Sequence, residues 1–151
     1  MADTTSVTST EKKGSTAGDV YEPGSVYVRT ITFATAASAT GYGDTDIINL
    51  SAYIPANTCI IAAAAKSTVT QGSATFAINL GGGTAFVAAT AVTSTTTFQP
   101  LAVTVANACT SASDQALQVV IGTATCAAAT VTLSLVCASL GTTEGLTTYS
   151  N

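Results

Sequence analysis

The sequence predicts a single all-β domain built as an antiparallel sandwich. Three observations lead there. The 151 residues are enough for one domain with a real core. Threonine and alanine dominate the composition, with 30 and 28 residues, and the β-branched threonine suits a pleated, half-buried surface. Short apolar segments recur at spacings near a dozen residues with turn signals between them, a pattern typical of sandwiches and barrels.

The expected strands follow one another from Ser25 onward. In the first, Tyr27, Arg29, Ile31 and Phe33 alternate with smaller residues, which gives the period of two that a strand requires. We expect the other strands over residues 46–50, 59–70, 74–80, 85–92, 98–105, 116–121 and 129–138, about eight in all. The alanine run at 61–65 could be helical, but no apolar stripe of period 3.6 continues on either side.

Turn signals separate these strands. Gly41–Asp44 and Ile54–Asn57 interrupt the chain, and Gln71-Gly72-Ser73 predicts a hairpin turn. The glycine triplet 81–83 lacks the lysine and the helix of a phosphate-binding loop, so it predicts a wide hairpin or a bulged loop. The threonine-rich run 93–97 shows no ranked repeat and predicts a polar loop.

Three regions are expected along the chain. Residues 1–24 are polar and too poor in large apolar side chains to form a core, so they predict a flexible N-terminal arm. Residues 25–140 form the β-sandwich domain, and residues 141–151 are a polar C-terminal tail. The arm carries Lys12 and Lys13, half of the basic residues. It is either a solubilising tail or a docking arm.

Charge is scarce. Charged residues make up 8% of the chain, against about 25% in typical proteins, and the net charge is −4. Four basic residues cannot form the cluster that nucleic acid binding needs. No apolar run predicts a transmembrane helix, and the start of the chain has no signal peptide pattern, so synthesis in a cytoplasm is expected.

Between Ser67 and Thr143 the only charged residue is Asp114. A domain with so few charged residues is predicted to be covered by other copies of the chain or by a larger assembly.

The four cysteines are Cys59, Cys109, Cys126 and Cys137, and no two of them form a CxxC pair. Without histidine, a zinc site would need all four thiolates. Each cysteine lies in an apolar or small-residue run, so we expect reduced, buried thiols. A disulfide among them is the main alternative.

No catalytic site or cofactor is expected. The chain has no histidine, so the commonest general base is missing and nucleophile–histidine arrangements are impossible. Asp44 and Asp46 could share a strand face and bind calcium, but aspartates at a glycine-rich turn usually bond their own backbone. We therefore expect no metal and no enzymatic activity.

Several segments resemble the small head and decoration proteins of tailed bacteriophages. They are residues 46–50 (DIINL), 54–57 (IPAN), 77–81 (AINLG) and 119–123 (VVIGT), followed by the TVTL strand at 130–133. The similarity is one of apolar and turn positions and covers about residues 44–138. Asn57 stands where the pattern has glycine, and asparagine tolerates the left-handed region that such a turn needs.

The resemblance implies a jelly-roll-like sandwich that assembles as a homotrimer on the outer surface of a phage head. There it would bind the major capsid protein and stabilise the shell. Candidate capsid contacts are Glu11, Lys12, Lys13 and Tyr21. Proteins with other roles in the virion have sequences of the same kind. The main alternative is a tail or head-fibre adhesin that binds a host surface glycan. Sugar-binding faces usually display aromatics, and outside 21–27 the only tyrosines are Tyr42, Tyr53 and Tyr149.

Overall fold

A computed structural model describes residues 4–7, 10–13, 26–110 and 112–140, and within the first two of these ranges it describes the backbone alone. The described residues form ten strands and one short 3-10 helix. The elements are β1 (Thr4–Val7), β2 (Thr10–Lys13), β3 (Val26–Ala34), β4 (Ile47–Ile54), β5 (Thr58–Ser67), β6 (Thr75–Leu80), β7 (Val87–Thr90), β8 (Gln99–Leu101), η1 (Val105–Asn107), β9 (Gln115–Gly122) and β10 (Thr130–Ser139). The all-β prediction is confirmed. No helix among these residues has the length or the apolar character to cross a membrane.

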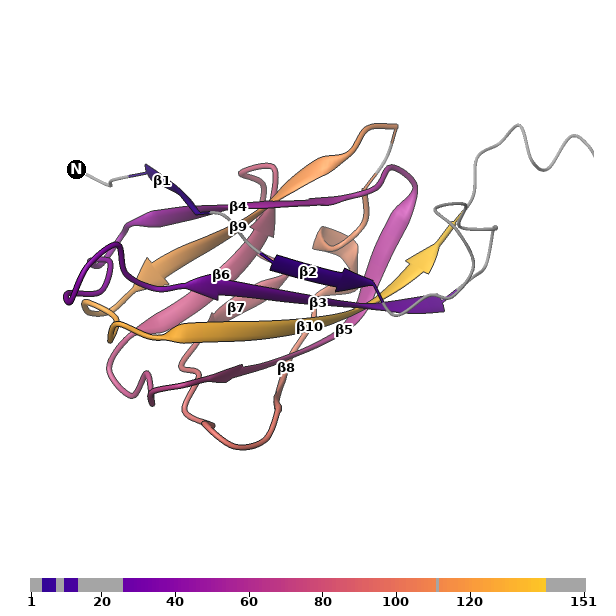
Figure 1. Cartoon of the computed structure of the whole chain (residues 1–151). Coiled ribbons are helices and arrows are strands. Elements are labelled where there is room, and N and C mark those ends of the chain that lie inside the picture. Colours follow the sequence, from indigo (N-terminus) through magenta and orange to yellow (C-terminus); the bar gives the residue numbers. More distant parts are fainter. Residues whose placement is uncertain (1–3, 8–9, 14–25, 111, 141–151) are drawn as a thin grey trace, which may run out of the picture.

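The strands form two packed sheets of five strands each (Figure 1). One sheet has the order β1-β4-β9-β6-β7, and the other has the order β2-β3-β10-β5-β8. From β3 to β10 every connection crosses from one sheet to the other, except the β6–β7 hairpin. All pairs among these eight strands are antiparallel. The predicted sandwich is therefore confirmed.

The core lies between the two sheets and follows the alternation seen in the sequence. In β10, Val131, Leu133, Leu135 and Cys137 face inward and are at most 2% exposed. In β3, Tyr27, Ile31 and Phe33 face the same interior. Arg29 shares that face and is 3% exposed, and its guanidinium donates to the carbonyl of Tyr53. A buried guanidinium is tolerated because it finds hydrogen-bond acceptors there.

Further segments of the chain cover the edges of β3 and β4 and part of the edge of β7. β1 pairs with β4 in parallel, and β2 pairs antiparallel with β3, so each sheet gains one strand on that side. On the opposite side, the Thr104 amide donates to the carbonyl of Phe86 (2.7 Å), and a bridge joins Val87 to Val103. β8 has only three residues and carries Pro100, which cannot donate to a further strand.

The two N-terminal strands were not anticipated. Residues 1–24 were expected to form a flexible arm because their side chains cannot form a core. Strand pairing needs backbone N–H and C=O groups, which every residue except proline supplies for strand addition. Residues 4–7 and 10–13 accordingly pair with sheets whose cores are built by other residues. The rest of the expected arm and the C-terminal tail at 141–151 lie outside the described residues.

The predicted hairpin at 71–73 is wrong. β5 and β6, which flank it, belong to different sheets, so the segment is a crossover. Its first residue, Gln71, is 1% exposed. The Gln71 side chain accepts a hydrogen bond from the amide of Ala127 (2.8 Å) and donates to the carbonyl of the same residue (3.1 Å). Turn composition indicates where the chain reverses but not which sheet it enters next.

The prediction of four reduced thiols is also wrong. A disulfide joins Cys59 to Cys109, and Cys126 and Cys137 are free and buried. The pairing arises because the segment after η1 lies beside the start of β5, which the spacing of 50 residues does not reveal. For the other two cysteines, the description as small buried hydrophobes is confirmed.

Candidate functional site

The capsid-contact candidates from the sequence fall in two places. Glu11, Lys12 and Lys13 lie together on β2, next to β3, with Lys12 opposite Thr30 and Lys13 opposite Arg29 in the backbone register. Tyr21 lies outside the described residues. The backbone therefore brings three of the four candidates to one edge of the β2-β3-β10-β5-β8 sheet.

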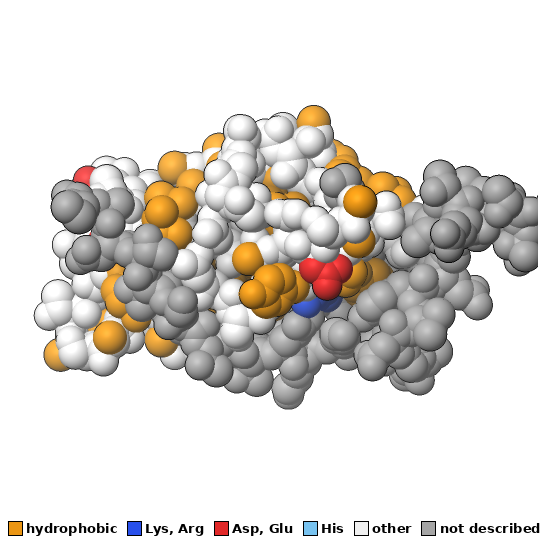
Figure 2. Space-filling model, turned by 90° about the horizontal axis from the view of Figure 1, so that it is seen from above, with side chains coloured by type: hydrophobic (Ala, Val, Ile, Leu, Met, Phe, Trp, Pro, Cys, Tyr) orange, Lys and Arg blue, Asp and Glu red, His pale blue; other side chains and the backbone are white. Residues whose placement is uncertain are grey.

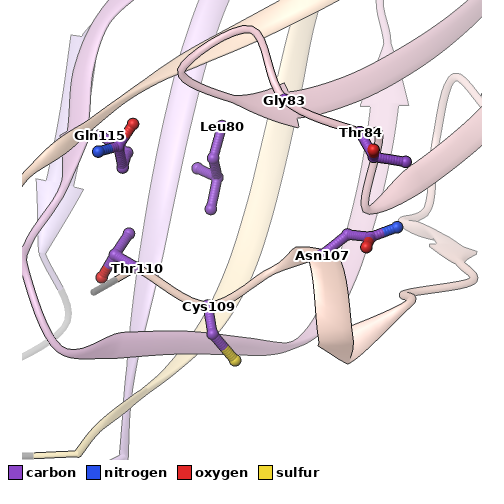
Figure 3. Close-up of a pocket in the computed structure, with 7 residues that line it drawn as sticks. All are labelled: Leu80, Gly83, Thr84, Asn107, Cys109, Thr110 and Gln115. Atoms are coloured by element: carbon purple, nitrogen blue, oxygen red, sulfur yellow. The ribbon is translucent and has the colours of Figure 1, made fainter.

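A pocket that the sequence analysis did not anticipate opens at one end of the sandwich (Figure 3). Its volume is about 220 Å³. Gln115 and Thr110 lie on one side of it, and Thr84 and Asn107 lie on the other. Leu80, Gly83 and Cys109 complete the lining. The residues come from the end of β6, the glycine turn, the segment after η1 and the start of β9.

The glycine triplet shapes one wall of the pocket. Gly81 and Gly82 have φ values of 57° and 77°, in the left-handed region that favours glycine. The amide of Gly83 donates to the carbonyl of Leu80 (2.9 Å) and closes the turn. A Cβ atom on Gly81 would collide with Oε1 of Gln115. Glycine therefore allows the Gln115 amide to lie against the turn. β6 and β7 pair antiparallel on either side of this connection, so the expected hairpin is confirmed.

The opposite wall is the segment from η1 to Thr110. Thr110 is 5% exposed; its hydroxyl accepts from the amide of Thr58 (2.9 Å) and donates to the carbonyl of Pro55. The Asn107 side chain donates to the carbonyl of Ala85 (3.1 Å), across the mouth of the β6–β7 connection. These bonds fix the wall against two other parts of the chain and leave Oδ1 of Asn107 without a donor among the described residues.

Near the pocket, three amide side chains form a row on the outer face of the sheet. Asn49, Gln118 and Asn79 are neighbours across β4, β9 and β6. Gln118 donates to Asn49 over 2.6 Å. Asn79 is 9% exposed, and its Oδ1 is buried without a hydrogen-bond donor in the described part of the chain. Because such buried acceptors are costly and rare, this row is an unusual polar feature of the sheet.

The pocket can form hydrogen bonds, but its described lining residues include no group that could transfer a proton near neutral pH. Its polar lining consists of amides and hydroxyls, and its cysteine is in a disulfide. Such a lining suits a neutral polar ligand, for example the hydroxyls of a sugar or the backbone of a peptide. No cluster of three histidine, cysteine, aspartate or glutamate residues occurs in the described ranges.

The aspartate pair considered for calcium has a structural role at Asp46. Its Oδ2 accepts a hydrogen bond from the amide of Gly43 (2.7 Å), which closes the turn before β4. Thr45, between the two aspartates, has a φ of 73°. The expectation of a backbone-bonded turn is therefore confirmed at Asp46. Asn57 has a φ of 54°, in the left-handed region that asparagine tolerates.

Comparisons with protein-family models, with curated proteins and with solved structures gave no match to this chain.

Proposed function

We propose that the protein is a structural component of a phage virion, a decoration protein that binds the outer surface of the head and stabilises it. It would be made in the host cytoplasm, assemble as a homotrimer and bind the major capsid protein. No enzymatic activity, cofactor, nucleic acid or membrane takes part in this proposal. The observation that carries it is the shortage of charge on the part of the surface that the structure describes.

Five charged side chains are described, Arg29, Asp44, Asp46, Lys66 and Asp114, and the first of them is buried. Figure 2 shows one face of the molecule, where uncharged polar and apolar side chains predominate and acidic and basic atoms form only small areas. Soluble monomers depend on surface charge to avoid association. A surface this neutral favours a protein that is covered by partners in its working state.

The strand order supports the finer part of the proposal. Two four-stranded antiparallel sheets, β3-β10-β5-β8 and β4-β9-β6-β7, are joined by crossovers on either side of one hairpin. This is the order expected for a jelly roll made of two Greek keys, a fold common in viral capsid proteins. We assign the sandwich to this class, and the choice of a trimer rests on the resemblance to decoration proteins.

The test is a stripping and reconstitution experiment. Particles freed of the protein should lose resistance to heat or low salt, and adding it back should restore that resistance. The mass of the free protein in solution should be that of a trimer. A monomer whose removal leaves the particles equally stable would overturn the proposal.

The edge that carries Lys12 gives a sharper version of this test. Lys12→Ala should weaken attachment to the stripped particle if that edge contacts the capsid. Lys66→Ala is the matched control, because it also removes one positive charge, from the neighbourhood of Phe98, whose ring centroid is 5.1 Å from Nζ of Lys66. Equal attachment of the two variants would remove the β2 edge from the proposed contact.

The pocket favours a second candidate function. Its uncharged amide and hydroxyl lining is suited to sugar hydroxyls, which supports the alternative of an adhesin that binds a host surface glycan. If that role holds, the protein should bind defined oligosaccharides on an array, and Gln115→Ala should abolish the binding. Thr95→Ala, in the exposed loop at 93–97, is the control that should keep it. Binding of no oligosaccharide would leave decoration as the better proposal.

A further inference from the structure

The Cys59–Cys109 disulfide links two residues that lie opposite each other in an antiparallel bridge. The amide of Ile60 donates to the carbonyl of Ala108 (2.9 Å), and the amide of Thr110 donates to the carbonyl of Thr58 (2.8 Å). Cys59 and Cys109 lie between these two bonds, as the pair that shares no hydrogen bond of its own. In an antiparallel ladder such pairs have the closest Cα atoms, and here the two are 4.0 Å apart.

The four cysteine residues differ in exposure. Cys109 is exposed, whereas Cys59 is 8% exposed. Cys126 and Cys137 are 3% and 0% exposed, and the Cys126 thiol donates to the carbonyls of Thr35 and Tyr42. A dissolved thiol can therefore reach the disulfide from the Cys109 side while the two free cysteines are protected.

The disulfide holds the wall of the pocket. Asn107, Cys109 and Thr110 supply three of its seven lining residues. Val105 is 44% exposed, and η1 contributes no buried residue to the core. Between η1 and β9, the covalent bond to β5 is thus one principal attachment of this wall, beside the two flanking main-chain hydrogen bonds, the buried Ala108 and the side-chain bonds of Asn107 and Thr110.

We propose that the Cys59–Cys109 disulfide is a redox latch that controls the pocket. In oxidising surroundings it holds the segment 105–110 against β5 and keeps the pocket formed. In reducing surroundings the latch opens, the segment moves more freely and the pocket loses its wall, while the rest of the sandwich stays folded.

The chemistry is thiol–disulfide exchange with a dithiol as reductant. A thiolate of the dithiol attacks Sγ of Cys109, which forms a mixed disulfide and releases the Cys59 thiolate. The second thiol of the dithiol then attacks its partner sulfur in the mixed disulfide and releases the Cys109 thiolate. Both released thiolates take up protons. The protein disulfide gains two electrons, and the dithiol leaves as a disulfide.

The biological meaning of this latch rests on the proposed virion function. A cytoplasm keeps accessible disulfides reduced, and the medium outside the cell lets them form. The pocket wall would be loose during synthesis and fixed on the released particle. The chemical part of the proposal concerns the isolated chain alone, so it can fail or hold independently of any capsid.

The experiment treats the full-length native protein with dithiothreitol, followed by iodoacetamide, and measures mass and amide hydrogen exchange. Two alkyl groups should be found, at Cys59 and Cys109. The exchange rates of the Ile60 and Thr110 amides should rise at least tenfold, while the rates in β10 stay unchanged. The variant carrying Cys59→Ala and Cys109→Ser should show the same pattern of amide exchange without reductant.

Three outcomes would overturn the latch. Alkylation of Cys126 or Cys137 in the native protein would contradict the selective access. Unchanged exchange at Ile60 and Thr110 after reduction would show that the other bonds hold the wall alone. Faster exchange throughout β10 would show that the disulfide supports the whole fold and does not act on the pocket in particular.

Discussion

Gln71 offers the most direct test of how the two sheets are joined. Its side chain lies 1% exposed in the β5–β6 crossover and bonds both main-chain groups of Ala127, at 2.8 Å and 3.1 Å. The carbonyl of Ala127 has a second donor, the hydroxyl of Thr35, at 2.6 Å. The amide of Ala127 has no acceptor other than Oε1 of Gln71 among the described residues. Removal of the glutamine therefore affects the amide more than the carbonyl.

We expect Gln71→Ala to lower the free energy of unfolding by about 3 kcal/mol. Two lost hydrogen bonds contribute roughly 1 kcal/mol each, and the unsatisfied amide adds about 1 kcal/mol or more. For a body of about 115 residues, with an unfolding entropy of about 2.1 cal/mol/K per residue, the melting temperature should fall by roughly 12 °C. Thermal unfolding followed by circular dichroism and urea titration both measure this change.

Gln71→Glu separates hydrogen bonding from the space that the side chain fills. At neutral pH its carboxylate still accepts from the Ala127 amide, but it faces the Ala127 carbonyl and is buried. Burial raises the pKa of such a carboxyl in the folded state, so the variant should be destabilised above the unfolded pKa and should recover as pH falls. Gln115→Ala is the control, since its partner is the exposed Ser113, and it should change stability by no more than about 0.5 kcal/mol. Equal effects of Gln71→Ala and Gln115→Ala would refute the reasoning.

The remaining predictions concern packing, titration and the N-terminal strands. Gly41→Ala should destabilise strongly, because its Cβ would collide with the carbonyl of Cys126, whereas Gly72→Ala should be nearly neutral in urea titration, since its nearest neighbour lies 3.9 Å away. Burial raises the pKa of the Cys126 thiol above its ordinary value of 9.0, so its contribution to stability is complete below that pH and is lost as pH rises above it. Unfolding of wild type and Cys126→Ala from pH 8 to 10 measures the difference, which a flat profile would contradict. Deletion of residues 1–13 uncovers β3 and β4, so light scattering should show more self-association, and an unchanged signal would contradict it.

The strands from β3 to β10 could be predicted because alternation is a local property. The expected first strand begins within a residue of β3, and the last matches β10 closely. β8 is much shorter than expected, because the chain leaves the sheet after Leu101 and Val105 enters η1 instead. The run 61–65 lies inside β5, where Ala63 and Ala65 face the core. Period and turn signals thus located most elements.

The pocket and the disulfide could not be predicted, since both depend on long-range topology. Asn107 and Gln115 are ordinary amides in the sequence. They line one pocket only because the end of β6, η1 and the start of β9 lie at the same end of the sandwich. The glycine triplet 81–83 was the one local feature of the sequence that pointed to this part of the pocket. It indicated an unusual turn, which is the wall on which the Gln115 side chain rests. The partner of Cys59 likewise depends on where the segment after η1 crosses β5.

The covered edges change which surfaces can mediate assembly. Strand edges without lysine or proline invite further pairing. In the fold, β1 and β2 pair with β4 and β3, and the bonds from Phe86 and Val87 to the 103–104 segment cover part of β7. Assembly through described surfaces can therefore use the short outer strands β1, β2 and β8 or, over a larger area, contacts between sheet faces and loops. Such contacts depend on side-chain fit, so Thr132→Arg, on the outer face of β10, should disrupt an assembly that strand addition would leave intact.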